Sequence, residues 1–227
     1  MSPVAVSVVV VVPVYGNEAT LAALTARLAD SLHDRPWRLR LVIDASPDAS
    51  AAVAAGLAAA DPRVAVTVLD RNMGQHAALE IGLAAEPHAL AWVCLDADLQ
   101  DPPEAVPLLL DRLAQGDVRA VFAGRRGAYE GPLRLLTGRA HRALLARLTG
   151  LPPDAGAFLA LDAGARRVVL AAQAPSLVAA IGVARLPVAS LPVARAAREG
   201  GHGRSAWTVR KRVRQSARTL AWVARRR

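Results

Sequence analysis

Residues 90–104 read LAWVCLDADLQDPPE, an apolar run that ends in acidic residues and is then broken by two prolines. The run from Leu90 to Leu95 is short and continuous, which is typical of a parallel strand buried on both faces. Asp96 and Asp98 follow at its carboxyl end, and side chains two residues apart in an extended chain project to the same side. Because ligands of open α/β sheets bind outside the carboxyl ends of strands, we expect both carboxylates to face such a crevice.

The acidic pair has the chemistry of a divalent-cation site. Carboxylate oxygens suit Mg²⁺ or Mn²⁺, which bind through one or two carboxylates together with water and substrate phosphates. The side chain of Gln100 adds a neutral oxygen nearby, so we predict a metal site formed by Asp96, Asp98 and Gln100. A bare Asp-x-Asp is more typical of a polar strand end or a helix cap. The buried strand before the pair favours the metal site.

The longer string DADLQDPPE resembles that of glycosyltransferase family 2 enzymes of the dolichol-phosphate mannosyltransferase type, also called polyprenyl-phosphate glycosyltransferases. The resemblance implies a GT-A-like, Rossmann-type α/β fold with a mostly parallel central sheet flanked by helices. It also implies transfer of a sugar, with inversion, from a UDP-, GDP- or dTDP-linked donor to a polyprenyl or dolichyl phosphate. Asp96 and Asp98 would be the catalytic residues, and Asp96 would also contact the nucleotide.

The composition favours one folded domain of this class. A chain of 227 residues with 53% hydrophobic and 21% charged residues can bury a full core. Cys94 is the only cysteine, so an internal disulfide is excluded, and its place in the apolar run predicts a buried side chain. No apolar stretch is long enough to cross a bilayer, and the N-terminus lacks the pattern of a signal peptide, so we expect a cytoplasmic protein.

The excess positive charge lies at the C-terminus. Of the 28 Lys and Arg residues, nine fall between Gly200 and Arg227, where the sequence has neither Asp nor Glu, and the other 19 balance the 19 acidic residues. A neutral body argues against a general nucleic-acid-binding surface. The tail is instead predicted to meet an anionic partner.

The same tail has the pattern of an amphipathic helix. The residues on its apolar face are Val209, Val213, Leu220 and Val223, with Trp207 and Trp222 near the ends and basic residues around them. A basic amphipathic helix with tryptophan is typical of a segment that lies on an anionic membrane surface. We therefore predict a GT-A-like domain over 1–205 and a basic helix over 206–227. The predicted association with the membrane is peripheral, with a membrane subunit or a second copy of the chain as further candidate partners.

The first candidate nucleotide loop follows the N-terminal strand. The β-branched run Val6–Val12 predicts a strand ending at Pro13, and the string VVPVYGNEATL around that end lacks the G-x-G-x-x-G of dinucleotide-binding folds. This absence disfavours a dehydrogenase. The string resembles the family's nucleotide-binding loop, which implies that Pro13, Tyr15 and Glu18 line the base and ribose pocket.

A second strand is predicted over Trp37–Ile43, followed by the string IDASPDAS. The family usually carries two acidic or amide residues and Gly-Ser here, and only Asp44 and Ser46 match. The resemblance implies that Asp44 accepts a hydrogen bond from the N3–H of a uracil or thymine. Asp48 is predicted to cap the helix that starts near Ala49.

A third strand is predicted over Val64–Leu69, and the string RNMGQHAALEIGL after it matches the family's spacing. Gly74, Ala78 and Gly82 share a helix face, which permits either close packing or close approach of the nucleotide. His76 has no second His or Cys at ligand spacing, so we expect it at the surface or behind the site rather than on a metal. By resemblance, the predicted nucleotide-binding residues are Pro13, Tyr15, Glu18, Asp44, Asn72 and Asp96.

Arginines predict where the acceptor phosphate binds. A strand predicted over Val118–Ala123 leads into GRRGAYEGPLRLLTGRAHRALLARLTG, and GGHGRSAW follows at residues 200–207. Arginine forks match phosphate geometry, and the two strings resemble the family's acceptor loop and closing loop. The predicted phosphate-binding residues are Arg125, Arg126, Arg139, Arg198, Arg204 and Ser205. Arg142 and Arg147 are expected on a solvated helix face.

The string LPPDAGAFLALD departs from the family. Related enzymes commonly carry Gly-Asp-Phe-Arg or a similar polar form here, whereas this chain has Ala157 and Leu159 at the polar positions. A sugar hydroxyl needs a base to remove its proton, but a phosphate is already anionic at neutral pH, so the loss favours a phosphate acceptor. Two alternatives stay open: transfer to a sugar or secondary-metabolite hydroxyl, and an inactive GT-A-fold protein that docks a membrane complex through its tail.

Overall fold

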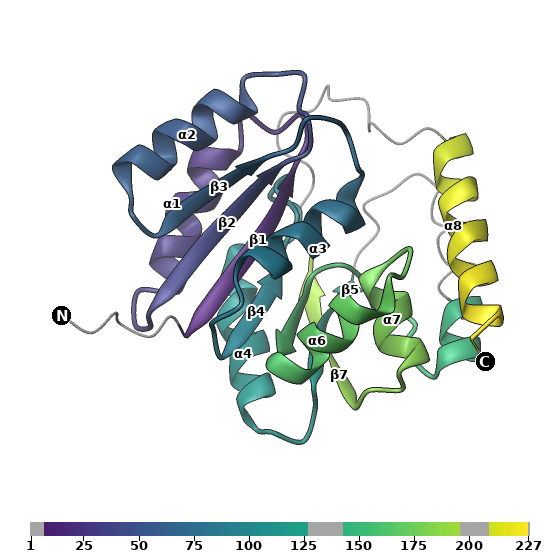
Figure 1. The fold of residues 1–227 in the computed structure, drawn as a ribbon. Coiled ribbons are helices and arrows are strands. Elements are labelled where there is room, and N and C mark those ends of the chain that lie inside the picture. Colours follow the sequence, from purple (N-terminus) through teal and green to yellow (C-terminus); the bar gives the residue numbers. More distant parts are fainter. Residues whose placement is uncertain (1–6, 127–142, 196–208, 227) are drawn as a thin grey trace.

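The computed structural model describes residues 7–126, 143–195 and 209–226. Seven strands form one sheet in the order β3-β2-β1-β4-β6-β5-β7, and helices cover both of its faces (Figure 1). The strands are β1 (Val8–Val14), β2 (Trp37–Ile43), β3 (Val64–Val68), β4 (Ala91–Cys94), β5 (Ala120–Arg126), β6 (Leu159–Asp162) and β7 (Val188–Ala194). Neighbouring strands pair in parallel except at β6, which runs antiparallel to both β4 and β5.

Helices connect most of the strands. They are α1 (Leu21–Ser31), α2 (Ser50–Ala60), α3 (Gln75–Ala85), α4 (Val106–Ala114), α6 (Ala163–Ala172), α7 (Leu177–Val183) and α8 (Val209–Ala224), with a further helix over 143–149. The 3-10 turn η1 (Pro103–Ala105) leads into α4. Within the described residues no single helix is long and apolar enough to span a membrane. Only α6 and α7, bent by 104° at their junction, meet that length and composition as a pair.

The alternation of side chains along β1 explains why the core has two halves. The even-numbered valines from Val8 to Val14 pack in a cluster with residues of α1 and α4, whereas Val9 and Val11 pack in a second cluster with residues of α3, α6 and α7. Consecutive side chains of a strand point to opposite faces. An uninterrupted valine run is therefore the sequence expected of a strand with helices on both sides.

The first strand differs from its prediction at both ends. β1 begins at Val8 and continues through Pro13 to Val14. Proline is tolerated there because the ladder between β1 and β4 ends at the pair Val11 and Cys94, so beyond it one side of β1 has no pairing for a proline to break. The predicted burial of Cys94 in a strand near the centre of the sheet is confirmed.

Helix α3 lies close against the sheet at Gly82. A Cβ atom added there would lie 2.3 Å from Val11 Cγ1 and 2.9 Å from Val42 Cγ2, so a larger residue would push the helix away. Packing therefore accounts for Gly82. Gly74 has a different reason, because it precedes α3 with a φ of +89°, a conformation that glycine adopts most readily.

Strand β7 forms one edge of the sheet. The stretch from Arg185 to Val193 contains two prolines, which favour an edge position because proline donates no ladder hydrogen bond. The structure confirms this prediction: β7 pairs with β5 and, within the described residues, with no other strand.

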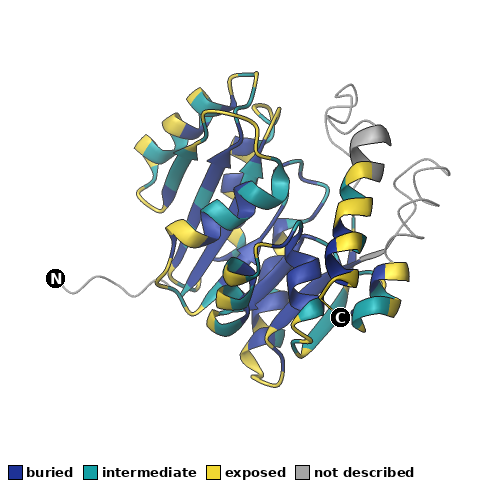
Figure 2. Cartoon of the chain, turned by 45° about the vertical axis from the view of Figure 1, so that its right-hand side comes forward, coloured by how far each residue is buried: buried dark blue, intermediate teal, exposed yellow. Residues whose placement is uncertain are grey.

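The C-terminal helix is present, but part of its apolar face meets the protein rather than a membrane. Thr219, Trp222 and Val223 are buried, and α8 contacts α7. Gln215 fixes the helix further through a 2.7 Å hydrogen bond from its Nε2 to the carbonyl oxygen of Pro175. The prediction that Trp222 and Val223 belong to a membrane-facing stripe is therefore wrong. Exposed residues run along the outward side of α8 (Figure 2).

Candidate active site

The acidic stretch after β4 leaves the sheet as a turn. β4 ends at Cys94 and residues 97–98 are in a turn, so the pair is not part of an extended strand as predicted. Even so, Asp96, Asp98 and Gln100 are partly exposed, whereas the residues between them are buried. The three predicted metal ligands thus share the accessible side of the turn. Leu99 adopts a φ of +57°, a conformation that costs a leucine about 1 kcal/mol and is typical of functional loops.

The carboxylate of Asp96 is held from two other elements. Gln75, the first residue of α3, donates a hydrogen bond of 2.6 Å from Nε2 to Asp96 Oδ1. Arg195, which directly follows β7, places Nη2 3.5 Å from Asp96 Oδ2. The orientation of Asp96 is therefore set by residues that lie 21 positions before it and 99 positions after it in the sequence.

Sequence reasoning did not identify Arg195. Its side chain is 6% exposed and forms a bidentate ion pair with Asp101, whose side chain is 1% exposed. Burial by itself would lower the pKa of Arg195, but Asp101, and to a lesser degree Asp96 and Asp98, raise it above the ordinary arginine value. Arg195 is thus a fixed cation beside the acidic turn. No local motif marks it, because it reaches the turn only through the pairing of β7 with β5.

Asp98 is oriented by its own turn. Its Oδ1 accepts the backbone N–H of Gln100 at 3.2 Å. Within the described residues no group of three or more His, Cys, Asp or Glu side chains is arranged to hold a cation. The predicted ligands, two carboxylates and one amide, would therefore hold a cation only together with further ligands such as phosphates and water.

Hydrogen bonds join the loops that follow β1 and β2. Ser46 Oγ accepts the N–H of Gly16 at 2.7 Å, and Glu18 Oε2 accepts the N–H of Ala49 at 2.6 Å. Asp48 accepts the N–H of Glu18 at 3.1 Å. Tyr15, at the tip of the first loop, is 39% exposed. The loop that carries Tyr15 and Glu18, two predicted nucleotide-binding residues, is therefore held by hydrogen bonds to the loop after β2.

Asp48 stands at the start of α2, although one residue earlier than predicted. The N-cap is Ala49, and Asp48 accepts the N–H of Ser50 at 3.1 Å and the hydroxyl of Ser46. Burial by itself would raise the pKa of Asp48. The hydrogen bonds from Ser46, Ser50 and the Glu18 N–H outweigh burial and lower this pKa to about 2.

Asp44 organises the loop before α3. It is 3% exposed, and its carboxylate accepts the N–H groups of Met73 at 2.6 Å and Gly74 at 2.8 Å. Asn72 donates to the carbonyl oxygen of Asp44 at 3.3 Å. Two residues predicted from separate strings thus lie together. The next residue, Ala45, has a φ of +49°, so alanine here keeps the left-handed conformation that the family's glycine would adopt easily.

Residues 9–154 match the family model described as Glycosyl transferase family 2. The chain belongs to this family. The match spans β1 to the turn before β6 and includes every predicted nucleotide and metal residue.

Curated relatives of this family 2 protein are named as undecaprenyl-phosphate transferases. An undecaprenyl-phosphate 4-deoxy-4-formamido-L-arabinose transferase from Pectobacterium carotovorum is 36% identical over 149 residues, which cover 63% of this chain and 44% of that protein. A protein of the same name from Pseudomonas aeruginosa is 42% identical over 120 residues, covering 51% of this chain and 35% of that protein. The matches thus span less than half the length of these relatives.

Solved structures confirm the GT-A-like α/β fold. Glucosyl-3-phosphoglycerate synthase from Mycobacterium tuberculosis, in complex with Mn²⁺, UDP-glucose and phosphoglyceric acid, has a TM-score of 0.70 at 21% identity and covers 97% of this chain and 79% of that one. Mannosyl-3-phosphoglycerate synthase from Rubrobacter xylanophilus has a TM-score of 0.69 at 17% identity, covering 97% and 74%.

The predicted phosphate-binding residues of this family 2 protein are mostly beyond what the structure describes. The backbone of Arg125 and Arg126 ends β5, paired with Val193 and Ala194 of β7. Their side chains lie outside the described part of the chain. So do Arg139, Arg198, Arg204 and Ser205, whose assignment stays a prediction.

One carboxylate near the site was missed by sequence reasoning. Asp154 accepts a hydrogen bond of 3.0 Å from Ser190 Oγ, and its Oδ2 lies so close to Gly124 that an added Cβ would meet it at 2.2 Å. Asp154 precedes β6, whose first residue pairs with the last residue of β4, so it lies at the same edge of the sheet as the acidic turn. Ala157 is largely buried and offers no carboxylate of its own.

Proposed function

We propose that this protein transfers a sugar from a nucleotide sugar to a lipid phosphate. The observation that carries the proposal is the acidic turn, where Asp96 and Asp98 share the accessible side at the carboxyl end of β4. Family membership supports the reaction type. The names of the relatives, transferases acting on undecaprenyl phosphate, support a lipid phosphate as acceptor.

The donor set fits Mg²⁺ or Mn²⁺. Asp98, Gln100 and Asp96 offer hard oxygen atoms without any sulfur or imidazole. The phosphates of the donor, together with water, would complete the coordination of the cation. When bound, the cation would supply charge stabilisation for the leaving diphosphate. Structural neighbours crystallised with UDP and Mn²⁺ or Mg²⁺ support this choice.

The donor nucleotide would lie over the loops after β1, β2 and β3. Tyr15 is exposed on the first loop for stacking or hydroxyl contacts, and Glu18 is fixed by its bond to Ala49. Asp44 and Asn72, which are joined by a hydrogen bond, lie at the same edge of the sheet. In this proposal the base and ribose lie beside β1 and β2, and the phosphates extend toward the acidic turn.

The acceptor would react as an anion. An oxygen of the lipid phosphate forms a bond to the anomeric carbon while the bond from that carbon to the donor's diphosphate oxygen breaks. The nucleoside diphosphate leaves with the electron pair of the broken bond. No proton has to be removed from the nucleophile, so the missing carboxylate at Ala157 does not hinder this reaction.

A sugar or metabolite hydroxyl remains a second candidate acceptor because of Asp154. This carboxylate lies at the same edge of the sheet as the acidic turn and could take the proton that a hydroxyl loses. The two candidates make different demands on Asp154. Transfer to a lipid phosphate should survive Asp154→Asn, whereas transfer to a hydroxyl should fall by about a hundredfold or more.

Membrane association would come from the outward side of α8. Arg214 and Arg226, which lie in α8 and just after it, are exposed, and together with the other basic residues of the tail they would be attracted to anionic lipid. Peripheral binding of this kind would bring the acidic turn near a lipid acceptor.

The central test is transfer by Asp98→Asn with radiolabelled nucleotide sugars and a short polyprenyl phosphate, with and without Mn²⁺. We expect Asp98→Asn to lose at least about a hundredfold in metal-dependent transfer. Asp111→Asn is the matched control, because Asp111 is an exposed carboxylate on α4 that makes only a 3.5 Å surface ion pair. Metal-dependent transfer that is equal in Asp98→Asn and wild type would remove the proposed role of the acidic turn.

A further inference from the structure

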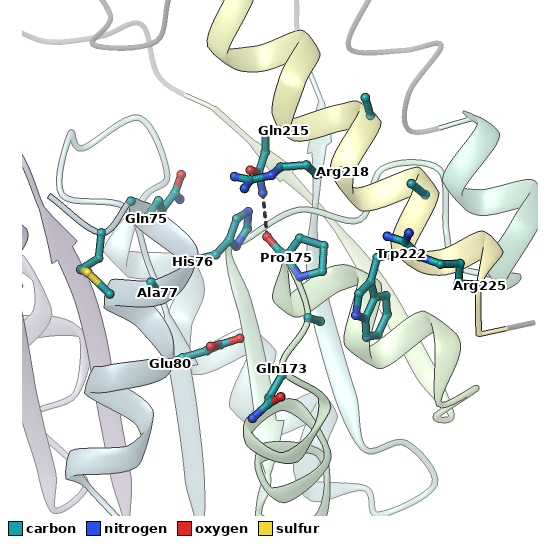
Figure 3. A pocket seen from close by; sticks show the side chains of 15 residues that line it. Gln75, His76, Ala77, Glu80, Gln173, Pro175, Gln215, Arg218, Trp222 and Arg225 are labelled. Atoms are coloured by element: carbon teal, nitrogen blue, oxygen red, sulfur yellow. Dashed lines mark hydrogen bonds between the residues drawn. The ribbon is translucent and has the colours of Figure 1, made fainter.

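A cavity of about 680 Å³ lies between α3, the loop before α7 and α8 (Figure 3). Its volume falls within the range of small-molecule sites. Gln75 lines the cavity and also donates the hydrogen bond to Asp96. The cavity therefore shares a wall with the acidic turn, although none of the acidic-turn residues line it.

Two polar atoms inside this α3–α8 cavity lack partners. His76 Nδ1 and Glu80 Oε1 are buried and make no hydrogen bond within the described residues. Both side chains project from α3 toward the cavity (Figure 3). A buried polar atom left unpaired costs about 1–3 kcal/mol, so such atoms are expected to have a ligand or water as partner. Burial lowers the pKa of His76 to about 4, so the imidazole is neutral and acts as a hydrogen-bonding group.

The charges around the cavity favour an anion. Arg218 and Arg225 line it from α8, and the Arg218 side chain extends toward His76 in Figure 3. The N-terminus of α3 adds little to this positive charge, because the carboxylate of Asp44 already accepts the N–H groups of Met73 and Gly74 there. Among the described lining residues Glu80 is the one acid, and burial raises its pKa. Arginine forks in such a setting suit a phosphate.

Most of the remaining wall is apolar, although Gln173 and Gln215 also line it. Ala174, Pro175, Ala217, Ala221 and Trp222 line the cavity beside the two arginines. A ligand that satisfies both parts of the surface has a phosphate at one end and hydrocarbon next to it. Inorganic phosphate would use only the polar part.

We propose that the α3–α8 cavity binds a phosphate monoester joined to a hydrocarbon chain, with the phosphate against Arg218 and His76 and the chain against Trp222. The inference rests on the proposed function in one respect: the ligand would be the acceptor of the transfer reaction. The side chain of Gln75, which lines the cavity and is hydrogen-bonded to Asp96, would then lie between the acceptor phosphate and Asp96.

The test is binding of farnesyl phosphate to the purified full chain, measured by calorimetry beside inorganic phosphate and farnesol. We expect farnesyl phosphate to bind at least about tenfold more tightly than either fragment, and Arg218→Gln to weaken its binding by about tenfold or more. Arg167→Gln is the charge-matched control, because Arg167 is an exposed arginine of α6 that does not line the cavity. His76→Phe, which fills the same space without a polar atom, should also weaken binding.

Three results would overturn the inference. Equal weakening by Arg218→Gln and Arg167→Gln would show a general charge effect rather than a site. Inorganic phosphate binding as tightly as farnesyl phosphate would leave no role for the apolar wall. Competition between farnesyl phosphate and UDP with Mn²⁺ would place the phosphate in the nucleotide site. Because these readouts are binding constants, their outcome does not depend on whether Asp98→Asn loses transfer activity.

Discussion

Gln75 Nε2 lies 2.6 Å from Asp96 Oδ1, and this hydrogen bond joins the first turn of α3 to the acidic turn after β4. A carboxylate that must hold one orientation for catalysis depends on such supporting bonds. The bond also connects the acidic turn with the α3–α8 cavity, since Gln75 lines that cavity.

Replacing Gln75 by alanine should free the Asp96 carboxylate from one of its supports. We expect transfer measured as kcat/KM to fall by about 10- to 100-fold, because a misplaced Asp96 carboxylate would stabilise the transition state less well. The stability of the fold should change much less. Gln115→Ala, a change at the exposed C-cap residue of α4, serves as control. A Gln75→Ala protein with wild-type kcat/KM would show that the other contacts of Asp96, including the one with Arg195, are sufficient to orient it.

The ion pair between Arg195 and Asp101 should be a main determinant of stability at this edge. Both side chains are almost fully buried, so Arg195→Met leaves the Asp101 charge without its partner and should cost about 3–5 kcal/mol. The double variant Arg195→Met/Asp101→Leu should recover much of this loss because no buried charge remains. Urea unfolding of both single variants and the double variant gives the coupling energy directly. Additive losses would mean that the two residues do not act as a pair.

The sequence predicted what depends on local pattern. The β-branched run of β1 and the apolar run of β4 specified central strands, and the alternation of burial around Asp98 was visible in the string itself. Arg195 and Asp154 were missed because each reaches the site through strand order, which places β7 beside β5 and β6 beside β4. The role of Trp222 was misjudged for a similar reason, since an amphipathic helix has the same pattern whether it covers protein or membrane.

Asp48 should make stability depend on pH at the acidic end. Its pKa is about 2 in the folded protein, below the ordinary 3.8, so the folded state favours the ionised form. This stabilisation is fully present above about pH 4 and is lost as the pH falls through about 2, with a size of about 2 kcal/mol at most. Asp48→Asn should therefore lower the free energy of unfolding at pH 7 and have little effect near pH 2. Asp70→Asn, an exposed change, is the control, and an effect of Asp48→Asn that is equal at both pH values would contradict the assignment.

Vesicle binding should depend on the exposed arginines of the C-terminal segment and not on the buried side of α8. Arg214 and Arg226 are exposed, so the double variant Arg214→Gln/Arg226→Gln should bind anionic vesicles about 30-fold more weakly at low salt, given about 1 kcal/mol for each arginine near the surface. Trp222 is buried in the protein, so Trp222→Leu should lower the melting temperature and leave vesicle binding unchanged. Flotation with phosphatidylserine vesicles at low and high salt, beside neutral vesicles, measures both effects. The opposite pattern, in which Trp222→Leu abolishes flotation of a folded protein and the arginine variant floats normally, would mean that α8 leaves the domain to insert its apolar face in the membrane.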